Sequence, residues 1–244
     1  MEHEIWITAL FNRFLSGPAN AVLGAFGLKA ADPAHPWADS LAIEIVVVAL
    51  TMILFAYLRT RLSVDSPGKL QHCFELFYEF IRAQAEEVVG HGSKRFLAFF
   101  GTIFLFVLFM NLIGIIPTLA SPTMFLEVPT GLAVATFIYY NSVGLRAHGV
   151  GGYVKTFFGP LILLAPLMLP IEIISHMARP LSLTIRLFAN MFAGEQITNT
   201  FLSLTYLFIP TLTMALHVFV SLLQAYIFAL LAMIYVGGAV AHDH

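Results

Sequence analysis

The feature that most restricts the fold of this chain is a set of long apolar stretches with almost no charged residues. A helix needs about 20 mostly apolar residues to cross the hydrocarbon core of a bilayer. Residues 41–58 carry a single carboxylate, Glu44, and residues 96–119 carry no charged side chain. Hydrophobic residues make up 59% of the chain and charged residues 11%, against about 45–50% and about 25% in a soluble domain. The sequence therefore predicts a membrane protein and excludes both a soluble and a disordered chain.

A third apolar stretch, residues 131–145, is short but has other marks of a membrane helix. Pro129 precedes it, and proline suits the first turn of a helix, where its missing N–H is not needed. Tyr139 and Tyr140 are typical of the membrane–water interface. We therefore predict a third membrane helix here.

Two longer apolar stretches follow, at residues 156–205 and 208–240. At about 1.5 Å per residue, each helix would exceed the thickness of a bilayer if it stood upright. Each must therefore tilt strongly or bend. Together the patterns predict an all-α, polytopic membrane fold with about five membrane helices, the last two forming a long, tilted hairpin. They also predict one membrane domain over residues 1–244.

The basic residues of the loops predict the orientation of the chain. They lie between the first two crossings and between the third and fourth, at Arg59, Arg61, Lys69, Arg82, Lys94, Arg95, Arg146 and Lys155. The positive-inside rule places these loops in the cytoplasm. We therefore expect residues 1–40 on the outer side and the C-terminus in the cytoplasm. The start of the chain resembles neither a signal peptide nor a transit peptide, which favours a bacterial inner (plasma) membrane.

Residues 71–89 have the spacing of an amphipathic helix. Apolar side chains recur three and four positions apart on one side, at Phe74, Phe77, Tyr78, Ile81, Ala85 and Val88. Charged side chains occupy the other side, at Glu75, Glu79, Arg82 and Glu86. This pattern suits an interfacial helix on the cytoplasmic surface of the membrane. It suits equally a helix that packs on the protein's own loops.

A row of polar residues crosses the fourth apolar stretch. Charged side chains at membrane depth are costly unless they are paired or hydrated, so each one is a candidate functional residue. The row consists of Glu172, Ser175, Arg179, Ser182, Arg186 and Asn190. On an ideal helix the other five lie within about 40° of Arg186, and the row is roughly 27 Å long. The spacing therefore predicts one polar stripe through most of the bilayer, bent at Pro180.

A second polar stripe lies in the last apolar stretch. His217, Ser221 and Gln224 share one helix face. Glu195 points away from the first stripe by about 180° on an ideal helix. If the two long helices form a hairpin that turns near residues 204–210, Glu195 and His217 reach similar depths. Such a pair can exchange protons near neutral pH.

Simpler interpretations are open for several of these residues. Serines in membrane helices commonly bond to their own backbone, and the two amides of the stripes can simply join helices. Arg179 and Glu44 can snorkel toward the membrane surface, and His176 suits the interface. Glu172 and His176 have the spacing of two metal ligands, but a third ligand at a useful spacing is lacking. We therefore predict neither a metal site nor a cofactor.

Arg186 is the natural break in the first stripe. A continuous polar track would let protons cross the membrane without control. An arginine guanidinium stays positively charged, so it repels a hydrated proton and attracts a carboxylate. The chain has no mobile acid of its own beside Arg186, so a carboxylate from a partner is implied.

Three segments closely resemble subunit a of the F-type ATP synthase: LSLTIRLFANMFAGE at residues 181–195, LLQAYIFALLAMIY at 222–235 and FMNLIGIIPT at 109–118. The resemblance covers nearly the whole chain. It implies a proton-translocating stator subunit that is not itself catalytic, assembled with a ring of subunit c, with subunit b and with the other subunits. It also implies two half-channels that Arg186 separates, and last helices that lie almost in the membrane plane.

The resemblance further implies which residues serve each half-channel. The positions that match the outer route are Asn190, Glu195, His217 and Gln224. Those that match the cytoplasmic route are Glu172, Ser175 and Ser182. At Gly114 the sequence departs from relatives that carry a carboxylate there, so we expect no channel role in this segment beyond Asn111 as a packing or polar contact.

Other classes of protein fit the sequence less well. The net charge of −2 and the lack of a long basic run argue against a nucleic-acid partner. The sequence contains no glycine-rich phosphate loop, so we expect no nucleotide site. A secondary transporter usually has internal repeats, and this sequence has none. An intramembrane hydrolase needs a Ser/His, paired Asp or HExxH arrangement, and the sequence offers none of these.

Overall fold

The fold is helical throughout the residues that the computed structural model describes, which are 5–25, 32–64, 66–90, 92–116, 119–156, 165–204 and 208–240. Its α-helices are α1 (Trp6–Ala25), α2 (Asp39–Thr60), α3 (Lys69–Val89), α4 (Leu97–Leu112), α5 (Glu127–Thr156), α6 (Ala165–Leu204) and α7 (Phe208–Val240). Short 3-10 turns flank α4, at η1 (Ser93–Phe96), η2 (Ile113–Ile115) and η3 (Pro122–Met124). Since these ranges contain no strand, the expected all-α fold is confirmed.

Among the described residues, three helical segments are long and apolar enough to cross a membrane: Asp39–Thr60, Ser93–Ile115 and Thr211–Val240. The most apolar part of each has a mean hydropathy of 2.5, 2.5 and 2.1, respectively. They coincide with the first, second and fifth apolar stretches of the sequence. α5 and α6 are more polar, in keeping with the interruptions seen in their sequences.

The structure differs from the predicted boundaries between the third and fourth helices. α5 continues past residue 145 to Thr156, with a break at Gly149, whose φ of 68° suits glycine. The predicted fourth helix therefore starts too early, because Thr156 still belongs to α5 and α6 begins at Ala165. Hydropathy marks the apolar part of a helix, but a helix can run on into a polar segment. Residues 157–164 and 205–207, which include part of the expected hairpin turn, lie outside the described residues.

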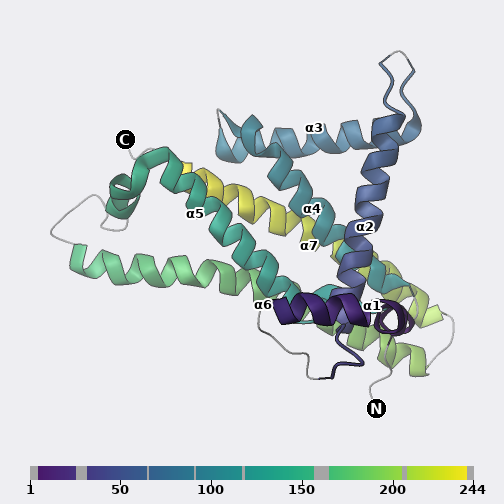
Figure 1. Ribbon diagram of the computed structural model, residues 1–244. Helices are drawn as coiled ribbons and strands as arrows, with labels where there is room; N and C mark the ends of the chain where they lie inside the picture. The colour runs from purple at the N-terminus through teal and green to yellow at the C-terminus, as the bar shows by residue number, and fades with distance from the viewer. Residues whose placement is uncertain are drawn as a thin grey trace.

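Figure 1 shows how the helices are inclined to one another. α2 stands nearly upright, with α1 lying across one of its ends and α3 across the other. α6 is steeply inclined to α2 and extends across the width of the molecule, and α7 is inclined as well. With 40 and 33 residues, α6 and α7 are about 60 and 50 Å long. Pro170 and Pro180 both lie within α6 and do not end it.

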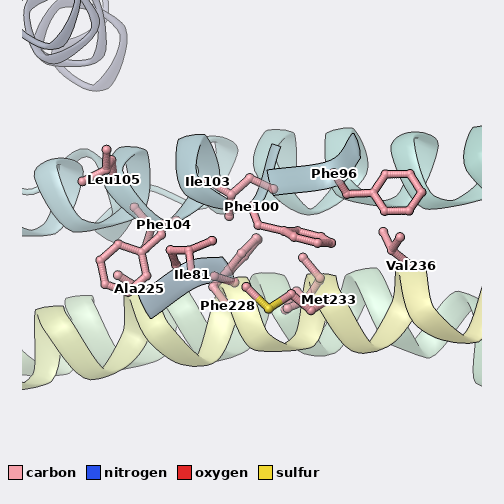
Figure 2. Close-up of a cluster of buried hydrophobic side chains, with 14 of the residues drawn as sticks. Ile81, Phe96, Phe100, Ile103, Phe104, Leu105, Ala225, Phe228, Met233 and Val236 are labelled. Carbon is pink, nitrogen blue, oxygen red and sulfur yellow. The ribbon is translucent and has the colours of Figure 1, made fainter. Parts of the chain in front are cut away.

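The main hydrophobic core forms where α7 packs against α4, with α3, α5 and α6 around them. Figure 2 shows Phe100 of α4 close to Phe228 and Met233 of α7. The side of α7 that faces this core also carries buried alanines, at Ala225, Ala229 and Ala232. Small side chains let helix backbones approach closely in a membrane. α7 is therefore the central element of this core, in contact with α3, α4, α5 and α6.

α3 buries the face that the amphipathic pattern predicted. Ile81 and Ala85 are buried, and Phe74 and Phe77 pack against the core, while the charged residues of the other side are exposed. Tyr78, on the same apolar side of the sequence pattern, is 53% exposed and does not join this packing. The helix contacts α7, the short turn η1 and α4.

α1 has no counterpart among the predicted elements, since residues 1–40 were expected only as an outer segment. Gly17 and Pro18 lie inside this helix, so its own sequence favours a helix weakly. Contacts with the segment before α2 hold it instead. The Trp37 backbone N–H donates to Asn12 Oδ1 at 3.0 Å, and the Phe11 and Trp37 rings meet edge to face at 5.5 Å.

Replacing Gly114 tests the close contact between the end of α4 and Ser121. A Cβ at Gly114 would lie 2.8 Å from Cβ and 2.9 Å from the backbone N of Ser121, which is too close for real atoms. We expect Gly114→Ala to lower the free energy of unfolding by about 1–3 kcal/mol through overpacking. The measurement is thermal unfolding of the purified chain in detergent.

Gly101→Ala is the matched control, because it adds the same methyl group at a glycine within α4. Its Cβ would lie 3.8 Å from the Phe77 ring, an ordinary contact. We expect this control to unfold at or near the temperature of the original chain. Equal unfolding temperatures for the two variants would show that Gly114 is not a close-packed position.

Candidate functional site

The first polar stripe lies along an exposed face of α6. Ser175, Ser182 and Asn190 are exposed, and Arg186 is half-buried. Exposed apolar side chains continue around the helix from the stripe, at Ile171, Ile174, Leu181, Ile185 and Phe192. The other side of α6 is buried in the main core through Leu183, Leu187 and Met191. The rest of the described chain therefore holds the back of α6 and leaves the stripe uncovered.

Arg186 has no charged partner within the described part of the chain. The arginine ion pairs found there involve Arg82 and Arg179. Ser182 and Asn190, one turn before and after Arg186 on the same face, are uncharged. A charge on an otherwise apolar helix face is costly in a membrane unless something pairs with it. This position therefore suits contact with an acidic group from outside the chain.

Arg179 is held differently from Arg186. Its guanidinium Nη2 lies 3.8 Å from Glu172 Oε1. The same guanidinium lies over two aromatic rings, 5.9 Å from the centroid of Tyr140 and 5.3 Å from that of Tyr235. Such cation–π contacts favour a fixed position for a cation. The structure thus brings Glu172 and Arg179 together and ties both to α5 and α7, which the snorkelling interpretation did not anticipate.

His176 is buried between α6 and α5. Its residue is 9% exposed, and its Nε2 lies 2.8 Å from Asn141 Oδ1 on α5. Asn141 Oδ1 also accepts a hydrogen bond from the Tyr153 hydroxyl at 2.8 Å. The imidazole packs edge to face on Phe137. Its off-stripe direction on α6 therefore points it into the contact with α5, where polar partners satisfy it.

The residues described contain no group of three or more side chains suited to hold a metal ion. Glu172 pairs with Arg179, and His176 bonds to Asn141, so the two candidate ligands face different partners. Because each of these two side chains already has another partner, their spacing on α6 does not by itself make a metal site.

Glu195 and His217 meet at a cavity between α6, α7 and the end of α4. The cavity has a volume of about 250 Å³. Besides these two side chains, its wall includes Thr198 and Asn199 of α6 and Gly114 of η2. Glu195 and His217 therefore lie close to each other in the folded chain. A cavity of this size with an acid, a base and an amide in its wall has room for several water molecules.

A buried polar segment lies beside this cavity, and sequence reasoning missed most of it. The Ser121 backbone N–H donates to Glu195 Oε2 at 3.4 Å. The Ser121 hydroxyl donates to the Met110 carbonyl at 3.0 Å, and the Thr123 hydroxyl donates to Asn111 Oδ1 at 2.6 Å. Asn111, Ser121 and Thr123 are at most 1% exposed. These bonds connect the last residues of α4 to Glu195 of α6 through groups that hydropathy does not single out.

The second stripe faces inward on α7. His217 and Gln224 are each 7% exposed and Ser221 is 0% exposed. The His217 ring lies against Gly194 of α6, where an added Cβ would be 3.4 Å from Nδ1. His217 Nε2 and Ser221 Oγ are buried without a hydrogen-bond partner among the described residues. Buried groups of this kind are costly unless water bonds to them, so this face of α7 suits buried water.

The two stripes occupy different surroundings. The stripe of α6 lies on an uncovered face, whereas the stripe of α7 lies inside the helix packing. The contact between Gly194 and His217 is one place where the two helices bring polar positions together. The structure therefore groups Glu195 with His217, and Glu172 with Arg179, as two separate polar centres.

Comparison with known proteins gives one consistent result. The sequence model of the family described as ATP synthase A chain matches residues 41–237. The chain is 60% identical to "ATP synthase subunit a" of Solibacter usitatus (strain Ellin6076) over 235 residues, which is 96% of this chain and 100% of the relative. It is 45% identical to "ATP synthase subunit a" of Koribacter versatilis (strain Ellin345) over 244 residues, covering 100% of both chains.

Thr123→Val tests the buried polar segment. Valine keeps the shape of threonine but removes the hydroxyl that bonds to Asn111 Oδ1. The Asn111 side-chain N already lacks a partner among the described residues, so the whole amide would be unsatisfied. We expect a loss of about 1–3 kcal/mol in the free energy of unfolding. Thermal unfolding of the purified chain measures this.

Thr130→Val is the matched control for this change. The Thr130 hydroxyl lies in the first turn of α5, is exposed, and bonds among the described residues to the Leu126 carbonyl just before that helix, at 2.6 Å. We expect almost no effect from its removal. If Thr123→Val were as harmless as Thr130→Val, the segment would not depend on the Thr123 to Asn111 bond.

Proposed function

The chain belongs to the ATP synthase A chain family, and on that basis we propose that it is the stator subunit a of a rotary F-type ATP synthase that conducts protons through two half-channels. In this proposal the chain makes no ATP itself. It works in the membrane beside a ring of subunit c and with subunit b, and the catalytic sites lie on other subunits. Its N-terminus is on the outer side of a bacterial inner membrane and its C-terminus is in the cytoplasm.

One observation carries the proposal: Arg186 stands on an uncovered face of a steeply inclined helix, without a charged partner among the described residues. A protein surface of this kind at membrane depth calls for an acidic partner, because lipid cannot compensate the charge. A ring of subunits that each carry a carboxylate provides such a partner repeatedly as the ring turns. The exposed apolar side chains around the stripe suit the apolar surface of neighbouring helices.

The proposed outer half-channel uses Glu195, His217, Gln224 and Asn190. Glu195 and His217 line the same cavity, and Gln224 lies on the inward face of α7. A proton can pass between an acid, an imidazole and bound water near neutral pH. Asn190 lies on α6 one turn beyond Arg186, on the uncovered face, where a proton would reach the ring.

The proposed cytoplasmic half-channel uses Ser182, Ser175 and Glu172. These residues continue the uncovered stripe on the other side of Arg186. Glu172 pairs with Arg179 at 3.8 Å, so its carboxylate keeps a fixed direction at the end of the row. A proton released by the ring would pass along this row toward the cytoplasm.

Arg186 separates the two routes by its charge. A ring carboxylate arriving ionised is attracted to the guanidinium, and a hydrated proton is repelled from it. A proton from the outer route neutralises the carboxylate and releases it from Arg186. The neutral group can then enter the lipid as the ring turns, until it reaches the cytoplasmic route and gives up its proton.

Glu195→Gln tests the outer route. The amide keeps the size of the side chain but cannot take up and release a proton. We expect ATP-driven acidification of inverted membrane vesicles to fall by about tenfold or more, since loss of an acid–base group typically costs a factor of this size or larger. The rates are compared at equal amounts of assembled complex.

Glu127→Gln is the matched control. Glu127 lines a separate cavity between α2 and α5, together with Glu44, and has no part in the proposed routes. We expect its vesicles to acidify at the original rate. Normal pumping by Glu195→Gln would remove Glu195 from the route, while an equal loss in both variants would point to a general effect of removing a carboxylate.

A further inference from the structure

α1 lies flat across the end of a membrane-spanning helix. Figure 1 shows it crossing the Asp39 end of α2, while α3 crosses the opposite end. α2 has 22 residues, which corresponds to about 33 Å, close to the apolar thickness of a bilayer. α1 is therefore placed at the level of one membrane surface, with its axis along that surface.

One side of α1 is fixed to the segment that connects it to α2. Asn12 is 6% exposed, accepts a hydrogen bond from the Trp37 backbone N–H at 3.0 Å and donates to the Trp37 carbonyl at 3.5 Å. The Trp37 indole N–H donates to the Leu15 carbonyl at 3.1 Å. Nearer the end of the helix, the Asn20 amide donates to the Pro33 carbonyl at 2.8 Å. These bonds determine how α1 is rotated about its own axis.

The opposite side of α1 is apolar and exposed. Trp6, Leu10 and Phe14 follow one another at intervals of four residues and are 60%, 49% and 67% exposed. On an ideal helix Leu10 and Phe14 point about 160° away from Asn12. Residues 32–38, which bond to Asn12 through Trp37, lie on the side of α1 away from α3 (Figure 1). The apolar face of α1 is therefore turned toward the membrane layer that α2 crosses.

The exposed side of α2 continues this apolar surface. Leu41, Ile45 and Val48 near the start of α2 are 44%, 37% and 38% exposed. A crossing helix with exposed side chains of this kind faces lipid, and α1 contacts α2 and crosses the same end of it (Figure 1). Tryptophan favours the headgroup level, and phenylalanine and leucine favour the acyl chains below it.

We propose that α1 is an in-plane anchor whose Trp6, Leu10 and Phe14 insert into the lipid leaflet at the Asp39 end of α2. The occupant of this face is lipid. α1 carries one basic residue, Arg13, and no acidic residue, so burial of its apolar face leaves no acidic side chain to desolvate. The anchor would hold the start of α2 at a fixed depth. This inference does not depend on the proposed proton routes.

A spin label on α1 tests the proposal. Cys73 is the single cysteine and is exposed, so Cys73→Ser provides a background for one new cysteine. Phe14→Cys, labelled with a nitroxide, reports from the apolar face, and Ala34→Cys reports from the exposed connecting segment as the matched control. The full chain is reconstituted in phosphatidylcholine and phosphatidylglycerol nanodiscs. Power saturation then measures collisions with oxygen, which enters lipid, and with a water-soluble nickel chelate.

For the Phe14→Cys label we expect a ratio of oxygen to nickel collisions several times that of the Ala34→Cys label. Equal ratios would place the face in water and overturn the proposal. Protection of the Phe14→Cys label from both reagents would show that protein covers the face, which also overturns it. Leu10→Cys repeats the test one turn away, and gel filtration of each labelled chain shows whether it is folded.

Discussion

The arrangement depends on one constraint: a guanidinium at membrane depth needs a partner. The back of α6 is buried against the core through Leu183, Leu187 and Met191, while Arg186 remains on the uncovered face. α7, packed on α4 and α5, supplies the support that fixes this orientation. In the proposed function, another subunit provides the opposite charge. Membership of the ATP synthase A chain family supports this proposal, because an ATP synthase is a complex of several subunits.

The buried polar groups depend on close packing of backbone. Ser121 can reach Glu195 because Gly114 has no side chain in the space that Ser121 occupies. His217 can lie against α6 because Gly194 leaves room for the ring. The polar centre around Glu195 is thus built as much by two glycines as by its ionisable side chains.

The sequence predicted those features that repeat along a single helix. Hydropathy located the three helical segments that are long and apolar enough to cross a membrane. Spacing placed Arg186 and Asn190 on one face and His217 and Gln224 on another. It could not locate α1, whose stability comes from contacts such as that between Asn12 and Trp37. It also missed the bond between Ser121 and Glu195, because these residues are 74 positions apart and only the packed chain brings them together. The contact between His176 and Asn141 was missed for the same reason, since Asn141 lies on another helix.

The most direct measurement of the central claim is ATP-driven acidification of inverted vesicles that contain the assembled complex, together with their passive proton leak. Arg186→Ala is compared with Arg179→Ala, which removes a charge two turns away that already has a partner in Glu172. The account predicts that Arg186→Ala abolishes pumping at equal subunit content, whereas Arg179→Ala retains at least part of it. Normal pumping by Arg186→Ala would contradict the account, because another group would then have to separate the two routes.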